Sequence, residues 1–137
     1  MSRRVRNVKI GFVGLGRMGG GIARDLVEAD FPLLVYDTSG EAREPFGAMR
    51  VVARDIDETM AFCDVLMLSL PATPDVEQVV EQFLEMKPRG KIVVDLGTSI
   101  PSSTRRLAER LKDVDAEMLH APRWPAGRPA RRVEISP

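Results

Sequence analysis

Residues 8–37 read VKIGFVGLGRMGGGIARDLVEADFPLLVYD, and the rest of the chain is organised around this stretch. A short apolar run over 9–13 leads into Gly14, and a second apolar run, 33–36, ends in Asp37. Between the two runs stand glycines at the spacing GxGxxG and a segment whose apolar residues recur at helical spacing. The order of strand, glycine turn, helix, strand and acid predicts a βαβ unit that binds a dinucleotide.

Each glycine of the turn has a separate physical task in this interpretation. Gly14 permits the tight turn, Gly16 leaves the backbone open to a pyrophosphate, and Gly19 allows the helix to pack closely on the strand. The free N–H groups at the helix start suit an anion. Asp37 lies 18 residues after Gly19, near the usual ~20 for an acid that binds the adenosine ribose. A turn that only packs a helix on a sheet would leave Asp37 unexplained.

The composition is that of an ordinary globular protein: 137 residues, of which 44% are hydrophobic and 29% charged. Cys63 is the only cysteine, so no internal disulfide can form. The apolar runs are too short to span a membrane and no signal-peptide pattern precedes the first strand, so we expect a cytoplasmic protein with no membrane partner. Residues 10–120 contain 12 of the 20 basic residues and 19 of the 20 acidic residues. This acidic body argues against nucleic acid as a partner.

After Asp37 the chain alternates strand and helix patterns. We expect strands at 49–53, 64–70, 91–96 and 115–119, and helices at 39–46, 55–62 and 73–86 and from 100–102 onward. Ser39, Asp55 and Thr73 are the expected N-caps of the first three helices. Strands separated by helices of about ten residues form βαβ crossovers. The predicted fold class is therefore α/β: a Rossmann-type doubly wound parallel sheet, three-layered, in a single domain.

Ligands of such sheets bind outside the carboxyl ends of the strands. Those ends lie at 14–19, 37–38, 69–71 and 95–98, and we expect them to line one crevice. We divide the chain into a basic N-terminal lead (1–7), an NAD(P)-binding domain (8–122) and an irregular tail rich in Arg and Pro (123–137). Residues 133–136 have the composition of a short edge strand within that tail.

Four stretches, in order, resemble the β-hydroxyacid dehydrogenases, the family of 3-hydroxyisobutyrate dehydrogenase and tartronate semialdehyde reductase, related to 6-phosphogluconate dehydrogenase. They are GFVGLGRMGGGIARDLVEADFPLLVYD (11–37), CDVLMLSLPATPDVEQVV (63–80), VDLGTSIPSSTRRLAERL (94–111) and MLHAP (118–122). The Gly-Leu-Gly-x-Met-Gly turn, together with Thr98 and Pro101, is specific for this family among dinucleotide folds.

The resemblance implies a cofactor site. The pyrophosphate would be bordered by Leu15, Gly16, Arg17 and Met18, and the cofactor-binding turn is completed by Gly14 and Gly19. The adenosine ribose would meet Asp37 and Thr38. The path toward the nicotinamide would be lined by Leu70, Pro71 and Thr98. Thr98 could instead only begin the next helix. NAD is favoured over NADP because Asp37 would repel a 2′-phosphate, although Arg43, about a helical turn further on, leaves NADP open.

The sequence departs from the family at three places. Asp30 replaces the usual Gly after the first helix, where a left-handed backbone is often needed, and Gly97 replaces Ser before Thr98. After Pro122 the Val-Ser-Gly-Gly substrate loop is replaced by Arg-Trp-Pro-Ala. Beyond this loop the sequence shows no match to the family's helical domain, which carries the family's catalytic lysine.

We therefore expect the NAD(P)-binding domain of an oxidoreductase that moves a hydride between nicotinamide and a small 3-hydroxy acid or semialdehyde. The chain itself supplies no predicted catalytic residue and no metal site; His120 is better explained as structural or exposed than as catalytic. We expect a truncated or frame-shifted product that is inactive alone. We expect the small hydroxy-acid substrate to be bound only by the full-length relative. Family members are homo-oligomers. The alternative is a stand-alone, non-catalytic dinucleotide-binding module whose tail contacts a protein partner.

Overall fold

The computed structural model describes residues 7–121 and the backbone of Arg131–Arg132. The predicted lead 1–7 and tail 123–137 fall almost entirely outside these residues, as does the edge strand expected at 133–136. The chain forms two compact units, Met1–Ser69 and Leu70–Pro137. Among the described residues, none of the helices combines the length and apolar character that a membrane span requires.

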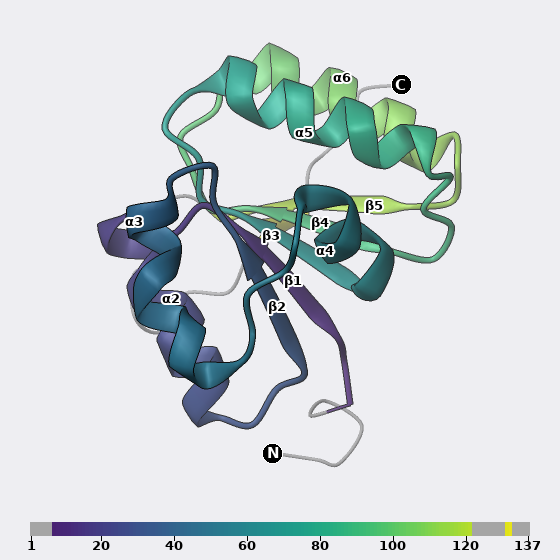
Figure 1. The fold of residues 1–137 in the computed structure, drawn as a ribbon. Helices are drawn as coiled ribbons and strands as arrows, with labels where there is room; N and C mark the ends of the chain where they lie inside the picture. Colours follow the sequence, from purple (N-terminus) through teal and green to yellow (C-terminus); the bar gives the residue numbers. More distant parts are fainter. Residues whose placement is uncertain (1–6, 122–130, 133–137) are drawn as a thin grey trace. The chain divides into compact units, whose positions relative to one another are not determined.

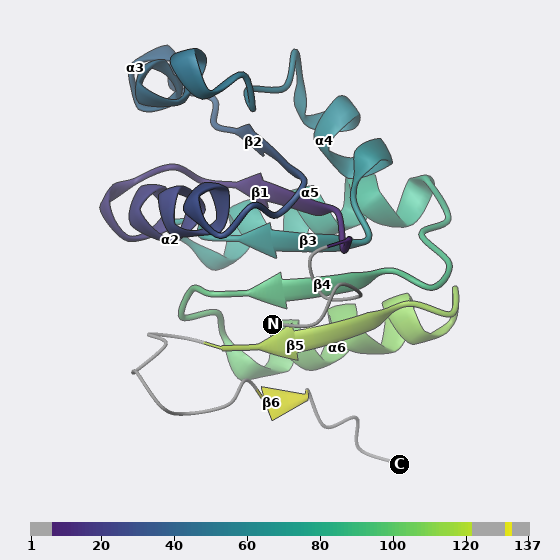
Figure 2. The same ribbon diagram turned by 90° about the horizontal axis from the view of Figure 1, so that it is seen from below.

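The first unit is a parallel sheet of three strands with helices on both sides. Its elements are β1 (Ile10–Val13), α2 (Arg17–Glu28), β2 (Leu33–Tyr36), α3 (Gly40–Arg43), the 3-10 helix η1 (Glu44–Met49), α4 (Ile56–Phe62) and β3 (Val65–Leu68). β1 is the central strand and pairs in parallel with β2 and β3. Figures 1 and 2 show α2 and α4 on opposite sides of β1 and β2. This arrangement agrees with the predicted doubly wound, three-layer class.

The core of this unit forms where the apolar strand residues meet α4. Gly11 of β1 has no room for a side chain, because a Cβ there would lie 2.8 Å from the Thr59 carbonyl oxygen of α4. α4 therefore lies directly on the central strand. The residues with no exposed surface in this core include Phe12, Val35, Met60, Cys63, Leu66 and Leu68. Cys63 is accordingly a packed thiol.

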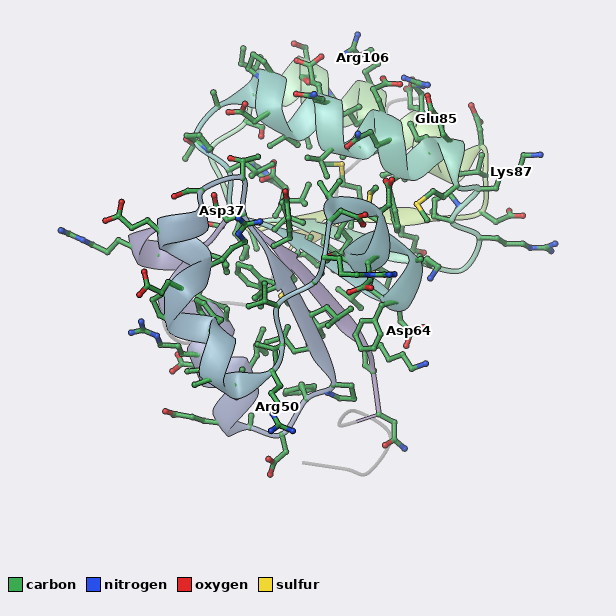
Figure 3. All side chains as sticks on the ribbon, viewed as in Figure 1. Asp37, Arg50, Asp64, Glu85, Lys87 and Arg106 are labelled. Carbon is green, nitrogen blue, oxygen red and sulfur yellow. The ribbon has the colours of Figure 1, made fainter. Side chains whose placement is uncertain are left out.

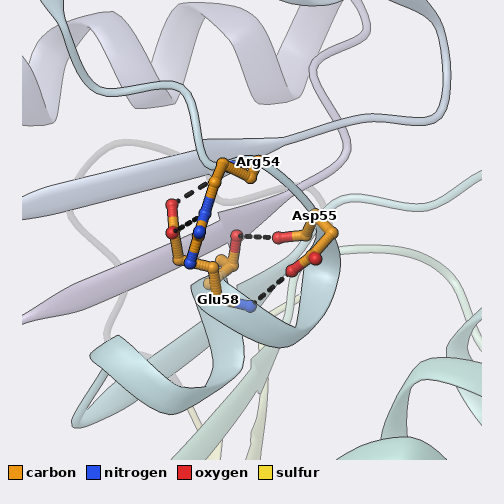
Figure 4. A network of polar contacts seen from close by, with 4 residues as sticks. Arg54, Asp55 and Glu58 are labelled. Carbon is orange, nitrogen blue, oxygen red and sulfur yellow. Dashed lines mark hydrogen bonds and ion pairs between the residues drawn. The ribbon is translucent and has the colours of Figure 1, made fainter.

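The start of α4 confirms a sequence prediction (Figure 4). The Oδ1 atom of Asp55 accepts a hydrogen bond of 2.8 Å from the Glu58 N–H, which makes Asp55 the N-cap. The Arg54 Nε donates to Oε2 of Glu58 at 2.6 Å, and the Thr59 hydroxyl donates to the Asp55 carbonyl oxygen. One capping aspartate and one local ion pair thus fix where this helix begins.

The described part of the second unit has three strands and two helices. These are α5 (Thr73–Glu85), β4 (Ile92–Asp95), α6 (Pro101–Lys112), β5 (Glu117–His120) and β6 (Arg131–Arg132). β4 and β5 pair in parallel, and β6 adds an antiparallel edge to β5 that was not predicted. α5 and α6 lie side by side (Figure 1). Two ion pairs connect them: Glu77 pairs with Arg106, which is labelled in Figure 3, and Glu81 pairs with Arg110. Exposed pairs of this kind stabilise a protein only slightly.

Two local predictions were wrong. The strand expected at 49–53 is absent: η1 extends to Met49, Arg50 turns the chain with a left-handed φ of 57°, and only Val52 makes an isolated bridge to Val35. Thr73 is not an N-cap, because α5 already begins at Thr73 and Ala72 holds the cap position. The Thr73 hydroxyl oxygen instead accepts the Ile100 N–H at 3.1 Å.

The end of α2 is a strained turn. Asp30 has φ 63°, and the N–H groups of Asp30 and Phe31 donate to the carbonyl oxygens of Val27 and Leu26. This is the pattern of a Schellman motif, in which glycine is the preferred left-handed residue. The left-handed backbone anticipated at Asp30 is therefore confirmed.

We predict that Asp30→Gly stabilises the protein by about 0.5–1 kcal/mol, since it removes the steric cost of a side chain at positive φ. The neighbouring Ala29 has φ −83°, so Ala29→Gly serves as the matched control and should destabilise by a similar amount. Urea denaturation of both variants measures the difference. Equal effects of the two substitutions would contradict the strain assigned to Asp30.

Candidate functional site: the strand ends of the two units

The glycine turn after β1 presents open backbone at its centre. Gly14 takes a φ of 102°, which side chains rarely adopt, and thereby starts the turn. Gly16 is the N-cap of α2, with no side-chain cap bond, and a Cβ built on it would meet nothing within 4 Å. Backbone N–H groups at an uncapped helix start are a ready anion site. The backbone at Gly16 is therefore accessible, as the predicted phosphate site requires.

Gly19 has the opposite environment. A Cβ at this position would lie 2.1 Å from the Gly14 carbonyl oxygen and 2.9 Å from the Ser69 Cβ. Both distances are below any real contact, and backbone atoms cannot move aside cheaply. Gly19 thus lets α2 approach the strand ends, as its place in the motif predicts.

Asp37 follows β2 and connects two segments of the first unit (labelled in Figure 3). Its Oδ2 accepts the Leu15 N–H at 2.7 Å, and its Oδ1 accepts the Ser39 N–H at 2.8 Å. The carboxylate therefore fixes the glycine turn and the turn after β2. The sequence pattern assigned Asp37 to a ribose and did not predict these bonds. Each oxygen has one further acceptor position, so a ribose hydroxyl can still bind.

The remaining predicted residues of this unit differ in exposure. The Leu15 side chain is buried in the core, so only its backbone belongs to the turn. Arg17 and Met18 begin α2 with exposed side chains, and Thr38 is exposed beside Asp37. The structure thus brings Gly14–Gly19 together with Asp37 at the ends of β1 and β2.

In the second unit, the segment Gly97–Ile100 follows β4 and is held by Asp95. The Asp95 carboxylate is fully buried; its Oδ1 accepts the Gly97 N–H at 2.9 Å, and its Oδ2 accepts the Ser99 hydroxyl at 2.6 Å. A Cβ on Gly97 would lie 3.1 Å from the Leu70 carbonyl oxygen. The segment at Leu70–Pro71 therefore lies against the segment that carries Thr98.

Two more side chains hold the same segment. His120 places its Nε2 3.0 Å from the Gly97 carbonyl oxygen, and since a carbonyl only accepts, Nε2 carries the hydrogen. At the other end, the Thr73 hydroxyl oxygen accepts the Ile100 N–H. Thr98 stands between these anchored residues. The hydrogen bond to Gly97 gives His120 a structural role. The sequence did not predict this particular bond, nor the bonds by which Asp95 and Thr73 anchor the segment.

The predicted site residues thus form two groups, one in each unit. Whether they line a single crevice remains a prediction. Within the described residues there is no cluster of three or more His, Cys, Asp or Glu side chains that could hold a metal ion.

The strand-end glycine turn, the acid after β2 and the βαβ order define a dinucleotide-binding α/β protein of Rossmann type. Residues 9–123 match the model of the NAD binding domain of 6-phosphogluconate dehydrogenase, and the chain belongs to this family. The structure also resembles that of 3-hydroxyisobutyrate dehydrogenase from Mycobacterium tuberculosis, with a TM-score of 0.78 and 26% identity over 85% of this chain and 40% of that one. The predicted fold class and family are confirmed.

Curated relatives agree. The chain is 32% identical over 121 residues to 2-hydroxy-3-oxopropionate reductase of Escherichia coli, covering 84% of this chain and 40% of that protein. It is 28% identical over 117 residues to mitochondrial 3-hydroxyisobutyrate dehydrogenase of Mus musculus, covering 82% of this chain and 35% of that protein. The chain therefore spans well under half the length of these relatives.

We predict that Gly19→Ala destabilises the protein by about 2–3 kcal/mol or more, because the new methyl group collides with backbone. Gly21→Ala is the matched control: it lies on the same helix, where a Cβ meets nothing within 4 Å, and should stabilise by up to about 1 kcal/mol. Denaturant titration followed by circular dichroism compares them. A Gly19→Ala protein as stable as the Gly21→Ala protein would contradict the close packing.

The buried carboxylate of the second unit yields a separate prediction. Asp95→Ala should cost about 2–4 kcal/mol, because the Gly97 N–H and the Ser99 hydroxyl lose their acceptor, and Asp95→Asn should cost less because one acceptor oxygen remains. The exposed Asp113 at the end of α6 provides the control, and Asp113→Ala should change stability by no more than about 0.5 kcal/mol. Similar unfolding midpoints for Asp95→Ala and Asp113→Ala would refute the anchoring role.

Proposed function

We propose that this chain binds NAD(P) at the turn formed by Gly14–Gly19 and Asp37, and that the protein is an oxidoreductase. The observation that carries the proposal is the pairing of an open Gly16 with a carboxylate that already fixes the turn around it. In this arrangement the pyrophosphate lies on the backbone at Gly16 and the start of α2, and the adenosine ribose lies at Asp37 and Thr38.

The second group of residues supports the nicotinamide end of the proposal. Leu70, Pro71 and Thr98 would border that ring, and the anchored segment Gly97–Ile100 would present Thr98 with little conformational freedom. A segment fixed before binding loses less entropy when a ligand arrives. When bound, the nicotinamide would supply the hydride chemistry, and this chain would supply binding and orientation.

The substrate class is also part of the proposal. Two of the relatives whose names state an activity are a 2-hydroxy-3-oxopropionate reductase and a 3-hydroxyisobutyrate dehydrogenase, which supports a small 3-hydroxy acid or its semialdehyde. The group that handles the hydroxyl proton is not assigned to any residue of this chain. A cytoplasmic location belongs to the same proposal, and so does a homo-oligomeric state of the full-length protein, which rests on the resemblance to the family alone.

We predict that Gly16→Ala weakens NADH binding about tenfold or more, because its methyl group takes the space where the phosphate meets the backbone. The substitution should leave the fold intact, since Gly16 has φ −65° and a Cβ there meets nothing within 4 Å. Calorimetric titration of the full chain with NADH measures the change.

Gly21→Ala is the matched control, since it adds the same methyl group on the same helix away from the turn. It should leave NADH affinity unchanged. Unaltered binding by a folded Gly16→Ala protein would exclude the glycine turn as the phosphate site, and an absence of NADH binding by the unsubstituted chain would remove the support for the proposed function.

A further inference from the structure

The hydrogen bond between His120 and Gly97 differs from the other bonds that hold the segment after β4. The bonds made by Asp95 and Thr73 engage the backbone N–H groups at the two ends of this segment and one hydroxyl within it. The His120 Nε2 instead donates to the Gly97 carbonyl oxygen at 3.0 Å. That carbonyl and the Thr98 nitrogen belong to one peptide group. Among the described bonds, the one from His120 therefore acts on the backbone unit that contains the Thr98 N–H.

The orientation of the Thr98 N–H follows from this bond. The peptide group between Gly97 and Thr98 is trans, so its carbonyl and its N–H point in opposite directions. Because the carbonyl is bound by the His120 ring, the N–H points away from that ring. It donates to no acceptor among the described residues, and Thr98 is exposed. The Thr98 N–H is therefore a fixed donor that is available to a ligand.

Gly97 gives the bond particular importance. Glycine has more backbone freedom than any other residue. Asp95 fixes the Gly97 N–H, but a rotation about the Cα–C bond of Gly97 would still turn the carbonyl and the Thr98 N–H together. The hydrogen bond from His120 opposes that rotation. It also polarises the peptide group, which strengthens the N–H as a donor.

His120 is itself held on a rigid element. It is the last residue of β5 and lies opposite Asp95 in the register of β4 and β5. The N–H of the next residue, Ala121, donates to the Asp95 carbonyl oxygen at 2.8 Å, so the pairing continues past the ring. A side chain mounted on a paired strand is placed more precisely than one on a loop.

We propose that His120 is a positioning residue for the nicotinamide end of the cofactor. Through the Gly97 carbonyl it orients the Thr98 N–H, which then donates to the carboxamide oxygen of the nicotinamide. The inference deepens the function proposed above and rests on it. It assigns neither a proton transfer nor a direct contact with the cofactor to His120. A donor that is oriented beforehand loses less conformational entropy when the ligand binds.

The test compares NADH with ADP-ribose, which lacks the nicotinamide, by calorimetric titration of the full chain. His120→Leu removes the donor and should raise the Kd for NADH about fivefold or more, the size expected for one lost hydrogen bond. It should change the Kd for ADP-ribose less than about twofold. His120→Gln keeps an N–H donor near the end of the side chain and should restore most of the NADH affinity.

Met118, which is buried on the same strand, provides the control. Met118→Val should lower the thermal unfolding midpoint through lost packing, and should leave the ratio of the NADH and ADP-ribose affinities unchanged. This variant separates a weaker β5 from a lost hydrogen bond. Thermal unfolding should also show that both His120 variants remain folded.

Unaltered NADH binding by a folded His120→Leu protein would overturn the proposal. Equal weakening of both probes would do the same, as would a His120→Gln protein that binds NADH no better than His120→Leu. If the unsubstituted chain binds ADP-ribose as tightly as NADH, the role of His120 fails while the dinucleotide site stands. If it binds neither probe, the function proposed above fails as well.

Discussion

The carboxylate of Asp37 connects the two strand ends on which the proposed site depends. β1 and β2 are adjacent and parallel, so their carboxyl ends meet at the same edge of the sheet. Asp37 uses this proximity: one oxygen accepts the Leu15 N–H within the glycine turn, and the other accepts the Ser39 N–H in the turn before α3. Hydrogen bonds to a charged acceptor are stronger than neutral ones. The shape of the glycine turn therefore depends on a residue that lies 22 positions from Leu15.

The second unit repeats this arrangement with a different outcome. Asp95 closes β4 and accepts the N–H of the residue two positions further on, as Asp37 does with Ser39. Asp95 is fully buried, and its second oxygen binds the Ser99 hydroxyl. It can only shape the segment that carries Thr98. Asp37 is partly exposed and each of its oxygens has a further acceptor position, so it shapes its turn and remains able to accept a hydrogen bond from a ligand.

Sequence reasoning located the elements whose signals are local. The strand at Leu33–Tyr36, the cap at Asp55 and the left-handed Asp30 each follow from periodicity, capping chemistry or steric limits over a few residues. It failed where a distant partner decides. Thr73 reads as a cap beside Pro74, yet α5 begins at Thr73 and its hydroxyl oxygen accepts the Ile100 N–H. The bonds of Asp37, Asp95 and His120 were likewise missed, because the choice of hydrogen-bond partner depends on tertiary contacts.

Folding and ligand binding are assigned to different residues of the glycine turn. Gly19 is closed, with a neighbouring carbonyl oxygen 2.1 Å from where a Cβ would lie, whereas Gly16 is open to at least 4 Å. Packing alone requires a glycine at position 19, but packing gives no reason for a glycine at position 16. An open glycine at a helix start that has no side-chain cap is instead explained by a ligand that must reach the backbone. At Asp37 the two requirements would coincide, since its removal would disturb the turn and the proposed ribose contact together. Gly16 is therefore the position at which binding can be altered while the fold is kept.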